Sequence, residues 1–204
     1  MSAYQEHEIT EASFAQIDLE VGAHAFSTAE YAVVRRIIHT TADFEFKHLV
    51  QFNHQPFVAA HQALQRGADI VTDVSMVAAG IANVGRKTWQ PTVSIAVQHS
   101  ISSVGETRSA SGMRQCAIAH PQAIFVIGNA PTALFALCEG IWQQKWQPAL
   151  VIGAPVGFIN VVESKKMLAE LAIPHILVAG RKGGSAVAAA IMNALMIWAW
   201  RQSS

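Results

Sequence analysis

The chain has few charged side chains, and this shortage narrows what it can be. Of its 204 residues, 14% are Asp, Glu, Lys or Arg, against roughly 25% in a typical globular domain, and the formal net charge is zero. The sequence has no excess of basic residues, so it gives no sign of binding nucleic acid. It also has no acidic tail that would suggest a cationic partner. So little charge suggests that some surface is buried against another subunit. The length suits a single domain over residues 1–204.

Cysteines and the common catalytic motifs are also scarce. Cys116 and Cys138 form no CxxC pair and no other metal-binding spacing, so we expect reduced thiols in a cytoplasmic protein. Cys138 lies in an apolar run, which favours an inert core thiol over a nucleophile. HExxH and GxSxG are missing from the sequence. We therefore predict no metal site and find no support for nucleophilic catalysis.

Signals for export or membrane insertion are missing as well. The beginning, MSAYQEHEITEASF, has neither the basic nor the apolar region of a signal peptide. The stretch Ser185–Trp200 is apolar except for Asn193, but a spanning helix needs about 20 apolar residues. We expect a buried or subunit-interface helix there, and no membrane partner.

What the sequence does contain is one unit repeated three times, over residues 123–139, 149–165 and 175–190. Each copy is a short Val- and Ile-rich run, a glycine-containing turn and a helix start, which is typical of buried parallel strands. Further strands are predicted at 68–72 and 92–98, the second followed by a Gly- and Ser-rich turn within 100–113. The alternation predicts an α/β fold: a mostly parallel sheet of about five strands with helices on both faces. Residues 44–55 fit neither pattern.

The turns after these strands are predicted to bind an anionic ligand, because open α/β sheets bind ligands at the carboxyl ends of their strands. They contain neither the GxGxxG nor the GKS/GKT pattern of the common nucleotide sites. Arg108, Lys165, Arg181 and Lys182 lie near predicted helix starts, which suggests a ligand with several carboxylates. Solvated surface charge is the alternative for each of them. Asp73 is predicted to cap the helix that follows it.

An earlier helix carries the candidate for proton transfer. Ser27 and Glu30 form a capping-box pattern that opens this helix. Tyr31, Arg35 and His39 follow one another at one-turn spacing, a stripe too polar for plain core. Histidine, with an ordinary pKa near 6.5, suits proton transfer, although most histidines are surface or hydrogen-bonded core residues.

Taken together, the motifs resemble one family. IGNAPTALFALCE, IGAPVGFINVVESK, GRKGGSA, GETRSA and DVSMVAAGI are similar to those of precorrin-8X methylmutase, and the resemblance covers about Thr10–Ala194. It implies an isomerase of cobalamin (vitamin B12) biosynthesis that moves a methyl group from C-11 to C-12 of precorrin-8X, giving hydrogenobyrinate, or of cobalt-precorrin-8, giving cobyrinate. It also implies a three-layer α/β sandwich, a homodimer, a tetrapyrrole substrate and no separate cofactor.

The resemblance also assigns roles to residues. The family's catalytic histidine follows R-M-I/V, and Arg36–His39 occupies that motif, so His39 is expected to protonate the ring. Ala12 stands where many members have arginine, which puts one carboxylate contact in doubt. The residues expected to contact the substrate are Ser13, Thr107, Arg108, Asn129, Gly153, Gly157, Arg181 and Lys182.

Two other interpretations remain open at this point. The first is a non-catalytic tetrapyrrole-binding protein that holds a corrinoid for transfer. The second is an unrelated α/β enzyme acting on a carboxylated or phosphorylated metabolite, against which the missing nucleotide motifs count.

Overall fold

The structure, a computed structural model, describes residues 4–101 and 105–203 and contains one six-stranded sheet. The strand order is β1-β6-β5-β4-β2-β3, and only β1 is antiparallel to its neighbour. The strands are β1 (Val50–Asn53), β2 (Ile70–Thr72), β3 (Val93–Ile95), β4 (Ile124–Ile127), β5 (Leu150–Gly153) and β6 (His175–Val178). The predicted turn within 100–113 includes residues 102–104, which lie outside the described residues.

The sixth strand, β1, comes from the segment that the sequence left unassigned. It has four residues, of which Val50 is buried and Gln51 exposed, and it follows the one-turn helix α3 (Phe46–Leu49). Val50 pairs with Val178 at the end of β6, so this edge strand begins where β6 ends. A strand this short next to a helical turn has no readable periodicity of its own.

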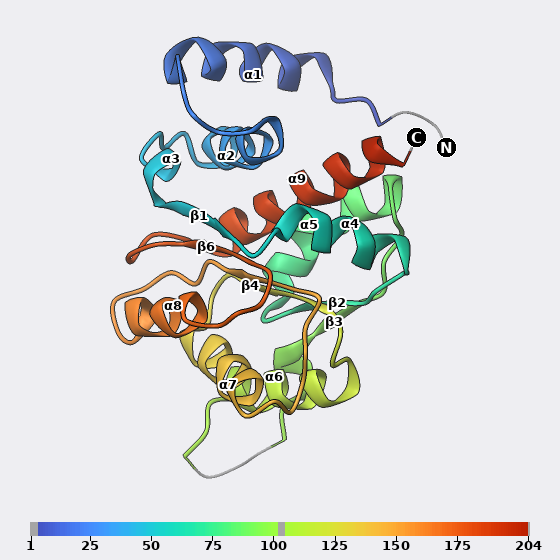
Figure 1. The fold of residues 1–204 in the computed structure, drawn as a ribbon, viewed down its shortest axis with the longest axis vertical. Helices are drawn as coiled ribbons and strands as arrows, with labels where there is room; N and C mark the ends of the chain where they lie inside the picture. The colour runs from blue at the N-terminus through green and yellow to red at the C-terminus, as the bar shows by residue number, and fades with distance from the viewer. Residues whose placement is uncertain (1–3, 102–104, 204) are drawn as a thin grey trace.

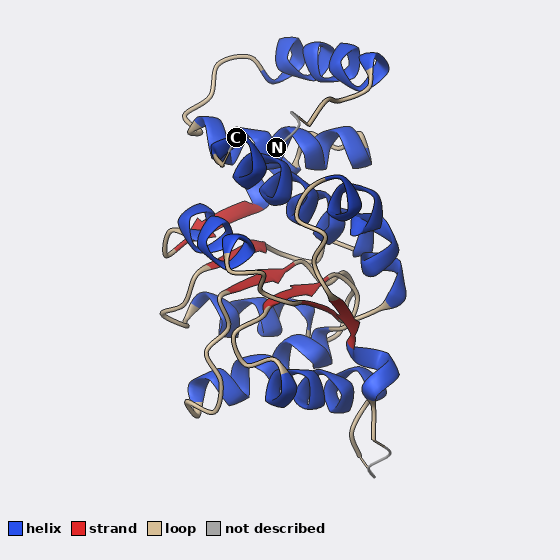
Figure 2. Ribbon diagram, turned by 90° about the vertical axis from the view of Figure 1, so that its right-hand side faces the viewer, coloured by secondary structure: helices blue, strands red, loops and turns tan. Residues whose placement is uncertain are grey.

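Helices cover both faces of the sheet, so the predicted three-layer α/β sandwich is confirmed (Figures 1 and 2). One face carries α2 (Thr28–Thr41), α4 (Pro56–Gln65), α5 (Ser75–Lys87) and α9 (Ser185–Gln202). The other carries α6 (Arg108–Ala119), α7 (Pro131–Trp142) and α8 (Val161–Ala169). A single-turn 3₁₀ helix (Ala96–His99) precedes α6. α1 (Glu8–Val21) packs on α2, on the side away from the sheet (Figure 1).

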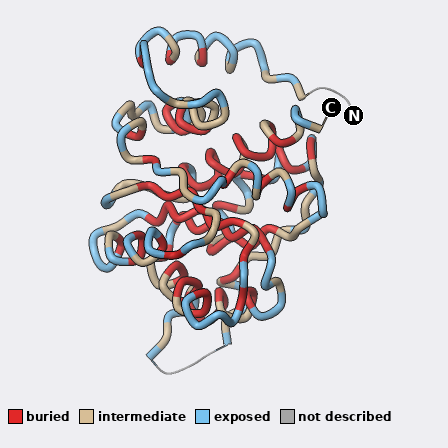
Figure 3. The backbone as a smooth tube through the Cα atoms, in the orientation of Figure 1, coloured by how far each residue is buried: buried red, intermediate tan, exposed pale blue. Residues whose placement is uncertain are grey.

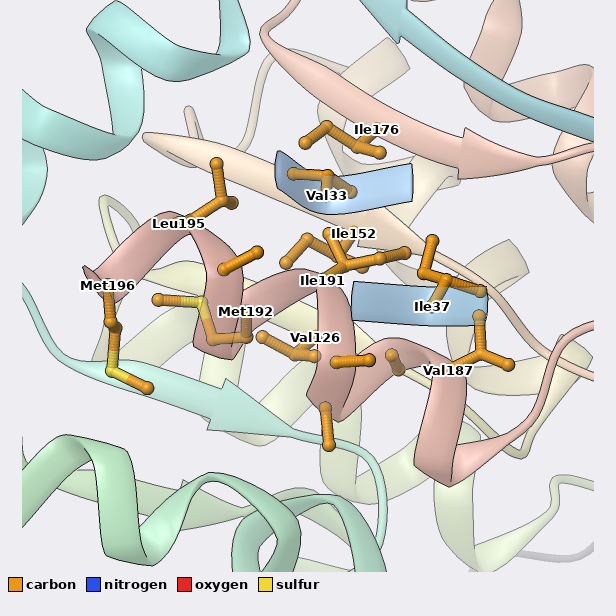
Figure 4. Close-up of a cluster of buried hydrophobic side chains, with 14 of the residues drawn as sticks. Val33, Ile37, Val126, Ile152, Ile176, Val187, Ile191, Met192, Leu195 and Met196 are labelled. Atoms are coloured by element: carbon orange, nitrogen blue, oxygen red, sulfur yellow. The ribbon is translucent and has the colours of Figure 1, made fainter. Parts of the chain in front are cut away.

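Successive strand residues divide the core into two clusters, as the two-residue period of a strand requires. In β4, Ile124 and Val126 belong to the cluster under α2 and α9, whereas Phe125 and Ile127 belong to the cluster under α6 and α7. Figure 4 shows Val126 next to Ile191 of α9 in the first cluster. Strands buried on both faces have no polar side, which is why they were readable in the sequence.

The apolar carboxyl-terminal stretch forms α9, and the prediction of a buried helix is confirmed. Almost every residue from Val187 to Ala199 is buried, and α9 packs against α2, α4 and α5. Figure 3 shows this helix largely in the buried colour, whereas the outer side of α1 is exposed. Within the described part of the chain, no helix has both the length and the apolar character needed to cross a membrane.

Asp73 does not cap α5, so that prediction is wrong. The N-cap residue is Val74, which has no side-chain capping bond. The carboxylate of Asp73 is fully buried and instead accepts three backbone N–H bonds from the loop after β4: from Gly128 (3.1 Å), Asn129 (2.7 Å) and Ala130 (2.8 Å). Burial raises the pKa of Asp73, and the three hydrogen bonds oppose that rise. This acid therefore ties the end of β2 to the loop between β4 and α7.

We predict that Asp73→Asn destabilises the fold. An amide oxygen can replace Oδ2, but the amide NH₂ would then face the Gly128 N–H, leaving a buried donor without a partner. The expected loss is about 1–3 kcal/mol of unfolding free energy, measured by urea denaturation. Asp69→Asn is the matched control, since Asp69 lies before β2 in a half-exposed pair with His120 (2.8 Å) and should cost less than about 1 kcal/mol. Equal losses in the two variants would contradict the role of Asp73.

We also predict that neither thiol of the folded protein reacts with a disulfide reagent at pH 8. Both cysteines are buried, and burial raises the pKa of Cys116 to about 11 and that of Cys138 to about 12. The reactive thiolate fraction is therefore on the order of one thousandth or less. A thiol titration should detect two groups only after denaturation, and a fast-reacting thiol in the folded protein would contradict this.

Candidate functional site

The sequence motifs meet along one edge of the sheet, the carboxyl edge, at which β2, β3, β4, β5 and β6 end and β1 begins. Six strands spaced about 4.8 Å apart make this edge about 24 Å long. Such a length suits a large, extended ligand better than a small metabolite. The loops along the edge are joined to one another by a series of hydrogen bonds.

At the β3 end of this edge, Thr107 joins two motifs. Its hydroxyl caps α6 by accepting from the Ala110 N–H (3.3 Å) and lies 2.8 Å from the hydroxyl of Thr132 in the first turn of α7. The neighbouring Arg108 is exposed, and its Nη2 donates to the Val97 carbonyl at 3.5 Å. Thr107 is thus occupied in holding GETRSA beside GNAPTA, whereas most of the Arg108 guanidinium remains open to a ligand.

The middle of the edge is formed by the loops after β4 and β5. The backbone N–H of Asn129 is held by Asp73, and its side chain is exposed beyond β4. The N–H of Ala154 donates to the Ile127 carbonyl (2.9 Å), which continues the series from β4 to β5. Gly153 is buried, and a Cβ there would lie 2.5 Å from Cδ2 of Leu168. Gly153 therefore lets α8 pack on β5, and the structure does not expose it to a ligand.

The loops after β5 and β6 are locked together. The N–H of Gly157 donates to the Arg181 carbonyl (3.3 Å), and that of Gly184 donates to the Ala154 carbonyl (2.8 Å). Gly183 allows this approach, since a Cβ on it would lie 2.3 Å from the Ala154 oxygen. The side chain of Arg181 is exposed and lies over the ring of Phe158, with 5.7 Å from Cζ to the ring centroid.

The two lysines of this region are both engaged by other groups of the chain, unlike the Arg181 guanidinium. Lys165 is 3% exposed, and its Nζ donates to the carbonyls of Gly180 and Lys182, both at 2.8 Å. Burial lowers the pKa of Lys165 to about 8. Nζ of Lys182 lies 2.5 Å from Asp43 and 2.7 Å from Glu45, so two carboxylates offset its charge. Lys182 thereby ties the turn after β6 to the segment between α2 and α3.

His39 lies at the β1 end of the same edge, in the last turn of α2. Its exposed ring contacts the ring of Phe14 edge-on at 5.2 Å and forms no hydrogen bond with the residues described here. It lines the His39 pocket, a hollow of about 610 Å³ between α1 and α2. The pocket is lined by Ile9, Ala12, Ser13, Gln16, Ile17, Glu20, Ile38, His39, Ala42 and Phe44.

The polar stripe on α2 has a structural explanation. Tyr31 donates to Oδ1 of Asp18 (2.6 Å), and Arg35 binds Oδ2 of the same carboxylate (2.9 Å), so both side chains dock α1 on α2. Burial and the bond to Asp18 raise the pKa of Tyr31 to about 12. His39 is the third member of the stripe and faces the His39 pocket instead. Docking α1 also brings Ser13 into that pocket, with its hydroxyl donating to the Ile9 carbonyl (2.8 Å).

The expected site residues therefore form separate groups within one chain. His39 and Ser13 belong to helices on the α2 side of the sheet, whereas Thr107 and Arg108 belong to α6 on the opposite side (Figure 1). Arg181, Gly157 and Asn129 lie between them along the carboxyl edge. In the described part of the chain, no three His, Cys, Asp or Glu side chains gather as a metal site would require.

Two features of the edge were missed in the sequence. The role of Asp73 was hidden because an acid directly after a strand and before a helix also fits a cap. In the loop after β5, Phe158 and Ile159 are exposed to solvent, with 83% and 79% of their surface accessible. The sequence carried a signal for this exposure: two large apolar residues directly follow the glycine of a turn, at a point where the buried strand has already ended.

Comparisons with known proteins agree with this architecture. The family model of precorrin-8X methylmutase (CbiC) matches residues 8–198. A cobalt-precorrin-8 methylmutase of Synechocystis sp. is 48% identical, with 97% of this chain and 98% of the relative covered. A precorrin-8X methylmutase of Sinorhizobium sp. is 34% identical, with 92% of each chain covered.

A solved structure is also similar. The crystal structure of a precorrin-8X methylmutase from Thermus thermophilus is 40% identical and superimposes with a TM-score of 0.88, covering 97% of this chain and 100% of that one. Fold, motifs and sequence thus agree over nearly the whole length. The chain belongs to the precorrin-8X methylmutase family of isomerases.

Proposed function

We propose that this chain moves a methyl group from C-11 to C-12 of precorrin-8X or cobalt-precorrin-8, yielding hydrogenobyrinate or cobyrinate, and that His39 donates the proton that favours the shift. The observation that carries the proposal is the His39 pocket. It presents an exposed imidazole in a hollow of about 610 Å³, at one end of the carboxyl edge of the sheet. Relatives are named for both the cobalt-containing and the cobalt-free ring, and the same rearrangement applies to either.

His39 would act as a general acid. Protonating the macrocycle draws electron density away from the migration centre and so lowers the barrier to the methyl shift. Because substrate and product are isomers, another proton leaves the ring within the same turnover, and the imidazole is restored. The pocket contributes orientation: Ile9, which is exposed, and Phe44, which is half-buried, offer apolar contact to a ring face, which holds the reacting carbons near the imidazole.

The carboxylates around the ring require cations, and two arginines are placed for them. Arg108 and Arg181 are exposed on the carboxyl edge and take part in none of the ion pairs formed by the described residues. We assign them to substrate carboxylates, with Asn129 and the backbone at Gly157 as neutral contacts. Lys182 already has two carboxylates, so we assign it to holding the turn rather than to direct charge pairing.

A homodimer would explain why these groups are separated. His39 and Arg108 lie on opposite sides of the sheet in one chain, and a second copy could bring its own edge residues to the same ring. The low charge content and the exposed Val156, Phe158 and Ile159 support a covered surface near the site. Two buried, unbonded thiols support a reducing, cytoplasmic compartment.

We predict that His39→Ala lowers kcat for precorrin-8X by at least about 100-fold, because general acid catalysis typically contributes that much. The ring is exposed, so the fold and most of the substrate affinity should remain. The appearance of the corrin spectrum measures turnover, and circular dichroism measures folding.

His48→Ala is the matched control, since His48 is an exposed histidine on α3 outside the His39 pocket, and it should convert substrate at the wild-type rate. Rapid turnover by the His39 variant would remove His39 from the mechanism. Binding of precorrin-8X without any conversion by the unaltered protein would instead indicate a corrinoid-binding protein.

Arg108→Ala should weaken substrate binding by about tenfold or more, because a charge-assisted hydrogen bond to a carboxylate is lost. The dissociation constant can be measured by absorbance titration. Arg66→Ala serves as control, since this exposed arginine lies at the end of α4, before β2 and so at the opposite edge of the sheet. Equal affinities of the Arg108 variant and the unaltered protein would show Arg108 to be surface charge only.

A further inference from the structure

Several groups in the turn after β6 are held by contacts with neighbouring segments. Lys165 binds the carbonyls of Gly180 and Lys182, and Gly157 binds the carbonyl of Arg181. The side chain of Lys182 is held by Asp43 and Glu45. Only the Arg181 side chain points away from these contacts, exposed and resting over Phe158. These contacts therefore hold the backbone of the turn in place and leave the Arg181 side chain exposed.

Lys165 makes two of the hydrogen bonds that hold this turn. Its two bonds reach the carbonyls of Gly180 and Lys182, which fixes the peptide planes directly before Arg181 and directly after Lys182. The plane between them, which carries the Arg181 carbonyl, is held by the Gly157 N–H. No acid among the described residues pairs with Lys165, so its charge is balanced only by these carbonyl dipoles. Like charges also repel, and the buried ammonium disfavours an inward orientation of the Arg181 guanidinium.

A buried ammonium is a costly way to satisfy two turn carbonyls, because desolvation penalises the charged form. The lowered pKa of Lys165, about 8, reflects that cost. Surface turns ordinarily leave such carbonyls to water. A lysine in this position thus suggests a function that depends on the geometry of the turn.

We propose that Lys165 is a positioning residue for substrate binding: it holds Arg181 where it can pair with a carboxylate of the tetrapyrrole while Phe158 contacts an adjacent apolar part of the ring. The inference rests on the proposed role of Arg181. Lys165 itself is buried and does not touch the substrate. Its contribution should therefore depend entirely on the presence of Arg181.

The test compares the Michaelis constants of Lys165→Met, Arg181→Ala and the double variant. Either single substitution should raise KM for the tetrapyrrole about tenfold and leave kcat within about twofold, because the lost contact is the same in ground and transition states. The double variant should match Arg181→Ala alone, since Lys165 acts through Arg181. Lys166→Met is the matched control: Lys166 is exposed on the same helix, and its KM should be unchanged.

The outcomes separate the two proposals. If Arg181→Ala leaves KM unchanged, the proposed role of Arg181 fails, and that of Lys165 fails with it. If Arg181→Ala raises KM but Lys165→Met only lowers the melting temperature, the inference about Lys165 alone is overturned. Additive effects in the double variant would overturn it as well.

A second variant keeps the inference testable if Lys165→Met does not fold. If circular dichroism shows Lys165→Met to be unfolded, Lys165→Arg keeps a buried cation but places a wider guanidinium against the two carbonyls. KM should rise in this variant, and the rise should vanish when Arg181→Ala is also present. An unchanged KM for Lys165→Arg, with KM raised in Arg181→Ala, would again overturn the inference.

Discussion

The buried carboxylate of Asp73 is the interaction on which the carboxyl edge depends. It takes three backbone N–H groups that no strand or helix could satisfy, and it thereby joins the end of β2 to the loop after β4. Without it, the Gly128–Ala130 loop would carry buried, unsatisfied donors into the first turn of α7. One acid thus fixes the spacing of two neighbouring loops and gives the rest of the edge its reference point.

From this point the edge is built by short links between loops. Thr107 reaches Thr132, Ala154 reaches Ile127, Gly184 reaches Ala154, and Lys182 reaches Asp43. Each link joins segments that are distant in sequence and adjacent in the sheet. The side chains of Arg108 and Arg181 take part in none of these links, so they can meet a carboxylated ligand. A rigid edge with a few open cations is well suited to orienting a large ring, because little conformational freedom is lost on binding.

His39, the proposed proton donor, lies at the β1 end of this edge on a separate helix pair. α1 is held on α2 by Asp18, which binds both Tyr31 and Arg35, and the gap left beside this attachment is the His39 pocket. α1 is also held by Phe14, Ile17 and Val21, which are buried in the cluster on this side of the sheet. The proposed acid, His39, and the proposed anchor Arg108 thus lie in different layers of the sandwich. Lys182 joins the turn after β6 to the segment that follows α2.

The sequence by itself determined the elements with strong local signals. The buried strands β4, β5 and β6 were readable because parallel strands are apolar on both faces, and the capping box at Ser27 and Glu30 was readable because its two bonds are local. The motif set also identified the family, and it singled out His39, which the structure places in a pocket. Only the tertiary structure decided that β1 joins the sheet, that Asp73 binds a loop 55 residues away, and that Lys165 faces inward while Arg181 faces solvent. These outcomes rest on contacts between distant segments, and a side chain's charge and neighbours in sequence do not reveal which distant backbone group it will meet.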